Sequence, residues 1–133
     1  MTVEWVTICA DGASRGNPGP AAIGAAIKDE QGKVVARISQ RIGIATNNQA
    51  EYRAIIAALK EAIRLGAKKI DISLDSQLVV RQISGRYRVR NAALKPLFQE
   101  VKQLTEHLEA VTITHVSRDQ NREADHLANM ALR

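Results

Sequence analysis

Apolar runs and short turns alternate over the first third of the chain, which predicts three β-strands. Residues 3–10, 23–28 and 34–42 are rich in apolar and β-branched side chains, as strands of a buried sheet are. The segment 12–20 between the first two runs is so rich in Gly and Pro that we expect an irregular loop there. Because the connections are short, the three strands are expected to pair as an antiparallel meander.

After residue 47 the spacing of the apolar residues lengthens to that of a helix. Tyr52, Ile55 and Leu59 share one helical face. They predict a helix over residues 48–65, which ends at Gly66 as a left-handed cap. The later elements are predicted as a strand over 70–74, helices over 76–83 and 94–108, a strand over 111–116 and a helix over 121–132. Helices between the last two strands allow a right-handed parallel crossover, so the pattern predicts an α/β fold with a mixed five-stranded sheet and helices on both faces.

The composition is that of an ordinary globular domain. Of the 133 residues, 45% are apolar and 25% are charged, which excludes collagen-like, coiled-coil and disordered classes. We therefore expect a single domain spanning residues 1–133. No apolar run approaches the ~20 residues of a membrane span, the first residues lack a secretory pattern, and Cys9 has no partner for an internal disulfide. We expect a cytoplasmic protein that has no membrane partner.

Basic residues outnumber acidic ones, with 19 Lys and Arg against 14 Asp and Glu and a net charge of +5. A basic balance suits a polyanionic partner such as a nucleic acid. Aromatic residues make up only 3% of the chain, which argues against a surface that stacks successive bases. The charge balance becomes informative only if acidic residues gather at one place.

Four acidic residues stand where the predicted elements could bring them together. Asp11 ends the first predicted strand and Asp75 ends the fourth, while Glu51 and Asp125 each lie one turn into a helix. If the first and fourth strands are adjacent and parallel, Asp11 and Asp75 leave the sheet side by side. Taken singly, each acid is better explained as a turn or helix-cap residue. Together they favour a site for Mg²⁺, which binds a few carboxylates, water and phosphate.

Four motifs, in order along the chain, resemble the signatures of type 1 ribonucleases H. They are DGASRGNPGP at 11–20, TNNQAE at 46–51, LDSQLV at 74–79 and NREADHLA at 121–128. The resemblance implies a ribonuclease H-like fold and hydrolysis of the RNA strand of RNA/DNA hybrids, with 5′-phosphate and 3′-hydroxyl ends. It also implies that two Mg²⁺ ions, or Mn²⁺ in their place, are held by Asp11, Glu51, Asp75 and Asp125. We expect the hybrid as partner, a monomer, and no obligate protein partner.

Other residues of the motifs are candidates for substrate binding. They are Gly12, Asn17, Thr46, Asn47, Asn48 and Gln77. The amides can donate and accept hydrogen bonds at 2′-hydroxyls and minor-groove base edges, and the 2′-hydroxyl distinguishes RNA from DNA. Gly12 lets the backbone approach a ribose, and Thr46 with Asn17 resembles the family's pocket for a phosphate of the DNA strand. Helix capping is the alternative role for Asn47 or Asn48.

Two features of the best-known family members are missing. The loop 116–121 has no histidine, and Arg118 is the only group in it that can carry a cation to the scissile phosphate. We interpret Arg118 as a catalytic candidate, against the alternative of a surface arginine paired with Asp119 or Glu123. The Trp-rich basic handle is also absent, and residues 85–95 offer only Arg86, Tyr87, Arg88 and Arg90 besides Lys95. A nucleic-acid-binding module with weak or lost catalysis is therefore the alternative function.

Three further side chains have a structural expectation. Trp5 lies in the first predicted strand and is expected in the core rather than as a platform for a nucleotide. His115 lies inside the fifth predicted strand and is expected to be packed there. Tyr87 lies between arginines, so a stacking role remains open for it.

Overall fold

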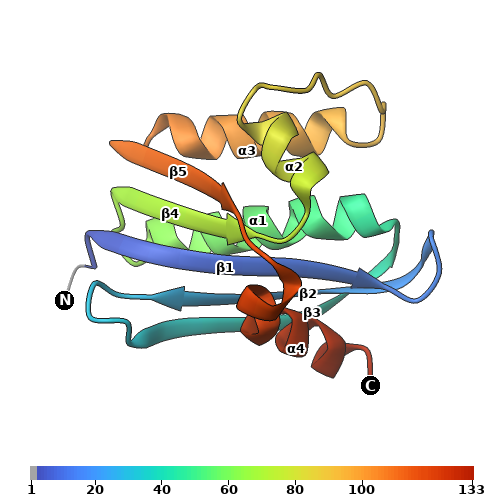
Figure 1. Ribbon diagram of the computed structural model, residues 1–133, viewed down its shortest axis with the longest axis horizontal. Helices are drawn as coiled ribbons and strands as arrows, with labels where there is room; N and C mark the ends of the chain where they lie inside the picture. Colours follow the sequence, from blue (N-terminus) through green and yellow to red (C-terminus); the bar gives the residue numbers. More distant parts are fainter. Residues whose placement is uncertain (1–2) are drawn as a thin grey trace.

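The structure is a computed structural model that describes residues 3–133. It contains one five-stranded sheet in the order β3-β2-β1-β4-β5 (Figure 1). The strands are β1 (Trp5–Ser14), β2 (Gly19–Lys28), β3 (Val34–Ala45), β4 (Lys69–Leu74) and β5 (Ala110–His115). β1, β2 and β3 pair antiparallel, whereas β4 pairs parallel to β1 and β5 parallel to β4. The predicted mixed sheet is thus confirmed.

Helices cover both faces of this sheet. They are α1 (Asn47–Arg64), α2 (Gln77–Ile83), α3 (Lys95–Glu106) and α4 (Arg122–Ala131), with a 3-10 turn η1 (Arg118–Asn121) before α4. Helix α1 packs on β1 and β2 and is itself covered by α3, while α4 packs on the opposite face against β1, β2 and β3 (Figure 1). Within residues 3–133 no helix has the length and apolar character to cross a bilayer.

The main core lies between the sheet and α1. Tyr52, Ile55 and Leu59 are fully buried in the helix, as the periodic pattern predicts, and they meet Ile8 of β1 and Ile72 of β4 in one apolar cluster. Full burial of one such aliphatic side chain stabilises the fold by about 1.5–3 kcal/mol. This cluster fixes the helix against the two central strands.

Capping residues set both ends of α1. Thr46 is its N-cap, and it forms a capping box in which its side chain accepts from the Gln49 N–H while the Gln49 side chain accepts from the Thr46 N–H. At the other end, Gly66 has φ 97°, so the predicted left-handed cap is confirmed. The capping box determines where α1 begins, one turn before Glu51.

The predicted loop 12–20 is wrong, because most of it belongs to a hairpin. β1 continues to Ser14, which pairs with Ala21 at the start of β2. Asp11 therefore does not end the strand but lies inside it, opposite Gly24. The parallel pairing of β1 with β4 stops earlier, at Cys9. Beyond Cys9, β1 is therefore still paired with β2 but no longer with β4, and the sheet opens beside Asp11.

Trp5 and His115 are both exposed, contrary to expectation. Trp5 is 46% exposed, and its indole N–H donates to the Asp71 carboxylate at 2.9 Å. Val6 and Ile8 of β1 are buried in the apolar cluster with α1, and the alternation along the strand leaves Trp5 on the other face of the sheet. His115 is the last residue of the edge strand β5 and has no strand beyond it.

Candidate active site

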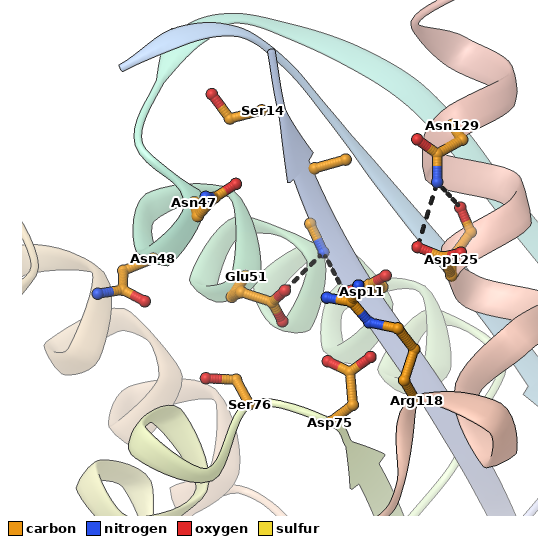
Figure 2. Close-up of a pocket in the computed structure, with 12 residues that line it drawn as sticks. Asp11, Ser14, Asn47, Asn48, Glu51, Asp75, Ser76, Arg118, Asp125 and Asn129 are labelled. Atoms are coloured by element: carbon orange, nitrogen blue, oxygen red, sulfur yellow. Dashed lines mark hydrogen bonds between the residues drawn. The ribbon is translucent and has the colours of Figure 1, made fainter. Parts of the chain in front are cut away.

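A cavity of about 540 Å³ opens at the point where β1 and β4 separate. Its lining includes acids from four different elements: Asp11 from β1, Glu51 from α1, Asp75 from the β4–α2 connection and Asp125 from α4 (Figure 2). The parallel pairing of β1 and β4 ends here on its carboxyl side, which is where open α/β sheets bind ligands. The structure thus brings together the four acids that the sequence places at separate elements.

Three of these acids form a tight cluster. Asp11, Glu51 and Asp75 each offer a carboxylate oxygen, and these oxygens lie within 4.8 Å of one another. Asp125 stands outside this cluster, and Figure 2 shows it on the other side of Asp11 from Glu51. Asp11 is therefore the carboxylate shared between the two halves of the site.

Burial perturbs the ionisation of the two innermost acids. Asp11 is 5% exposed and Glu51 is 8% exposed. Burial, followed by the charges and side chains of the neighbouring acids, raises the pKa of Asp11 to about 10. Burial also raises the pKa of Glu51 to about 7, although hydrogen bonds from Asp11 and the Gly12 N–H and the charge of Arg118 act in the opposite direction. The cluster therefore has too little positive charge around it to keep all of its carboxylates ionised.

The donor set fits a hard divalent cation. All ligand atoms on offer are carboxylate oxygens, the type that Mg²⁺ and Mn²⁺ bind. Among residues 3–133, Glu51 Oε2 and Asp75 Oδ2 are buried and accept no hydrogen bond. A buried carboxylate oxygen without a partner is costly unless a cation compensates it. Two such atoms in one cluster are a specific observation in favour of a metal site.

Gly12 allows α1 to approach β1 closely enough to build the cluster. A Cβ atom at this position would lie 2.6 Å from the Ala50 Cβ and closer still to the backbone of Ala50 and Glu51. The Gly12 N–H donates to Asp11 Oδ1 at 3.0 Å and to Glu51 Oε1 at 3.2 Å. This packing role, which the sequence pattern did not indicate, explains the glycine from the structure alone.

Comparison with known proteins agrees with this arrangement. A family model described as reverse transcriptase-like matches residues 9–131. The crystal structure of RNase H1 from Halobacterium salinarum superposes with a TM-score of 0.94 at 44% identity, covering 96% of this chain and 97% of that one. The chain belongs to the ribonuclease H family. Its predicted ribonuclease H-like fold is confirmed.

Two other similar proteins extend the comparison. A bifunctional protein of Mycobacterium tuberculosis is 44% identical over 128 residues, which cover 96% of this chain but only 35% of that protein. This chain thus spans about a third of the length of its mycobacterial relatives. LC11-RNase H1, isolated from compost by metagenomics and solved in complex with an RNA/DNA hybrid, has a TM-score of 0.89 at 39% identity and 95% coverage of both chains.

Arg118 is the only cationic residue of the loop 116–121, which has no histidine. It is the first residue of η1 and lines the cavity beside the four acids (Figure 2). Asn121, at the end of the same turn, is fully buried and donates to the Ala10 carbonyl at 3.0 Å, which ties the turn to β1 next to Asp11. The alternative pairings are wrong, because Asp119 pairs with Arg122 at 3.5 Å and Glu123 with Lys28 at 3.1 Å.

The substrate-binding candidates divide into two groups. Gly12, Asn47 and Asn48 line the cavity. Thr46 is the N-cap of α1, so the capping role considered for the two asparagines is wrong. The Asn17 side chain accepts from the Asn47 N–H at 3.0 Å and so joins the β1–β2 hairpin to the start of α1. Gln77, the first residue of α2, is exposed outside the cavity lining.

Asn129 and Ser76 also line the cavity, although the sequence pattern predicts a functional role for neither. Asn129 follows Asp125 by four residues, which places both on one face of α4. That spacing is the signal that could have identified Asn129. Ser76 is the N-cap of α2 and accepts from the Val79 N–H, so capping accounts for it.

A second cavity of about 540 Å³ lies where the family's basic handle is missing. It is lined by polar, basic and aromatic side chains, among them Arg86, Tyr87, Arg88 and Lys95. The Tyr87 ring lies 5.2 Å from the Arg81 guanidinium, which also donates to the Tyr87 hydroxyl at 2.7 Å. The segment therefore presents a basic surface, with Tyr87 held by Arg81.

Proposed function

We propose that this chain is a metal-dependent endoribonuclease that hydrolyses the RNA strand of RNA/DNA hybrids. The observation that carries the proposal is the cluster of Asp11, Glu51 and Asp75, whose oxygens converge within 4.8 Å with two of them buried and unpartnered. The similar LC11-RNase H1, solved with an RNA/DNA hybrid, supports the choice of substrate. Asp125, on the far side of Asp11, completes a set of four acids.

The acids divide into two ligand groups around a shared member. Asp11, Glu51 and Asp75 would hold one ion, and Asp11 with Asp125 would contribute to a second. When bound, two Mg²⁺ or Mn²⁺ ions supply Lewis acidity at the attacking water and at the leaving 3′-oxygen, which yields 5′-phosphate and 3′-hydroxyl ends. Gly12 orients the shared half, since its N–H donates to both Asp11 and Glu51.

The remaining residues bind and orient the hybrid. Asn47 and Asn48 present amides to the cavity, where they can donate to or accept from a 2′-hydroxyl and so distinguish RNA from DNA. Arg118 can pair with a phosphate through its planar guanidinium and stabilise charge that develops there. Thr46, Asn17 and Gln77 would contact the strands beside the cavity. We further propose that the chain acts as a monomer without an obligate protein partner.

The test is cleavage of a labelled RNA/DNA hybrid in Mg²⁺ or Mn²⁺, with single-stranded RNA and duplex DNA as controls. We expect RNA cleavage in the hybrid alone, and fragments that a ligase requiring a 5′-phosphate can join. Asp75→Asn keeps the shape of the side chain and removes one ligand charge, so this variant should stay folded and lose cleavage. Tight hybrid binding without cleavage in either metal would instead identify a nucleic-acid-binding module.

A further inference from the structure

We infer that Asn129 is a positioning residue that fixes the Asp125 carboxylate for metal binding. The Asn129 side-chain amide donates to Asp125 Oδ1 at 3.1 Å and to the Asp125 backbone carbonyl at 2.9 Å (Figure 2). Both residues line the cavity from α4. The inference rests on the proposed function, because Asp125 matters only as a ligand of that site.

Both hydrogen bonds of the Asn129 amide nitrogen end on one residue, Asp125. On Asp125, Oδ1 accepts from Asn129, which leaves Oδ2 free of this contact. A carboxylate that accepts a hydrogen bond at one oxygen cannot rotate freely, so its other oxygen keeps one orientation.

Asp125 lacks the restraints that hold Asp11 and Glu51. Glu51 and Asp11 are buried and share the Gly12 N–H, which restricts both carboxylates. Asp125 is only partly buried, stands outside the three-acid cluster, and forms no ion pair within residues 3–133. Asn129 is therefore the side chain that holds the fourth acid beside Asp11. Residues that orient a ligand typically change metal affinity or activity by 10–100-fold when replaced.

A purely helical role for Asn129 predicts a different set of results. Polar side chains often donate to the backbone carbonyl four residues earlier, which affects the helix and not the site. Ser at this position can still donate to that carbonyl, but it is too short to bridge to the carboxylate. Gln retains the amide and can reach an acid four residues away. Asn129→Ser and Asn129→Gln therefore separate the two roles, and Asn129→Leu removes both hydrogen bonds while it keeps the branching and the number of heavy atoms of the side chain.

The experiment measures Mn²⁺ binding by calorimetry without nucleic acid, alongside kcat for a hybrid in Mg²⁺. We expect Asn129→Leu and Asn129→Ser to weaken the weaker Mn²⁺-binding step at least tenfold and to lower kcat at least tenfold, while the tighter step stays within twofold of the parent. Asn129→Gln should recover part of both losses. Met130→Ala, on an exposed neighbour outside the cavity lining, is the matched control and should behave as the parent.

Asn129 is exposed, so its variants should melt within a few degrees of the parent. Parent-like Mn²⁺ binding and kcat in Asn129→Ser would assign the residue to the helix and overturn the inference. Equal weakening of both binding steps would also overturn it, since the effect would then not be specific to Asp125. A parent protein that binds Mn²⁺ but cleaves no hybrid would refute the proposed function, and the calorimetry would still decide the role of Asn129.

Discussion

Gly24→Ala should impair the active site by displacing helix α4. Gly24 of β2 lies opposite Asp11, and α4 crosses directly over it. A Cβ atom at Gly24 would lie 3.0 Å from the Leu127 carbonyl carbon and well inside contact distance of the Ala124 oxygen and the Ala128 nitrogen. All three are backbone positions of α4, so no side chain can rotate away to make room. The helix itself must move.

The distance by which α4 must move determines the expected loss of activity. Restoring ordinary contact of at least 3.4 Å requires α4 to shift by about 1 Å, and Asp125 shifts with it. Overpacking of this kind costs about 1–3 kcal/mol of unfolding free energy. A misplacement of about 1 Å in a catalytic group can cost a factor of ~100 in rate. We therefore expect kcat to fall by one to two orders of magnitude in a protein that still folds.

The assay pairs chemical denaturation with hybrid cleavage at saturating Mg²⁺. Gly32→Ala is the control, because Gly32 has φ 82° and no atom of residues 3–133 lies within 4 Å of an added Cβ. Its cost is conformational, about 1 kcal/mol, and it should leave kcat unchanged. Gly24→Ala with a parent-like kcat would refute the argument that α4 is positioned by this contact. A loss of kcat as large in Gly32→Ala would attribute the effect to reduced stability in general.

Three further outcomes follow from the site and its surroundings. Because burial holds the pKa of Asp11 at about 10, the folded metal-free chain keeps a proton that the unfolded chain releases above about pH 4, and the free energy of unfolding should fall as pH rises between these values. Denaturation at several pH values should show that Asp11→Asn flattens this fall, and an equally steep fall in the variant would contradict it. Arg118→Ala should lower kcat at least tenfold, which corresponds to about 1.4 kcal/mol in the activation barrier, and Arg118→Lys should recover only part of this loss. Rates of Arg118→Ala within twofold of the parent would show that Arg118 has no catalytic role. Changing Arg86, Arg88 and Arg90 to Ala should raise KM more than it lowers kcat and reduce the log–log salt slope of hybrid affinity by up to about 3; an unchanged slope would exclude phosphate contacts.

The sequence predicts those parts of the fold that depend on local pattern. The stripe of Tyr52, Ile55 and Leu59 predicts α1 because a buried helical face requires that spacing. The ends of the first two strands are missed because Gly and Pro between them indicate an irregular loop. Gly19 is needed for another reason, since a Cβ there would collide with the Arg15 carbonyl where the hairpin closes. Local composition does not distinguish a loop glycine from one required by a close approach.

The candidate site is predicted in its residue types but not in its grouping. Spacing along the chain places the four acids at element ends, yet it cannot show that three converge and that Asp125 stands apart. The same limit applies to Trp5, whose neighbours in the sequence suggest burial while the tertiary fold leaves its side chain exposed. The inferred role of Asn129 depends on its hydrogen bond to Asp125, which the helix geometry makes possible. Each of these features depends on where helices pack, which no single segment specifies.

Two helices approach the sheet closely at neighbouring positions on opposite faces, and this places the acids together. Gly12 of β1 admits α1 and so brings Glu51 to one side of Asp11, while Gly24 of β2 admits α4 and brings Asp125 to the other. The nearest atoms at both glycines belong to the helix backbone, which is less free to adjust than side chains or loops are. Packing therefore holds the acids together despite their mutual repulsion, and it fixes the positions of the proposed ligands before an ion binds. Side chains of ordinary size at these two glycines should impair the site more than they impair the core.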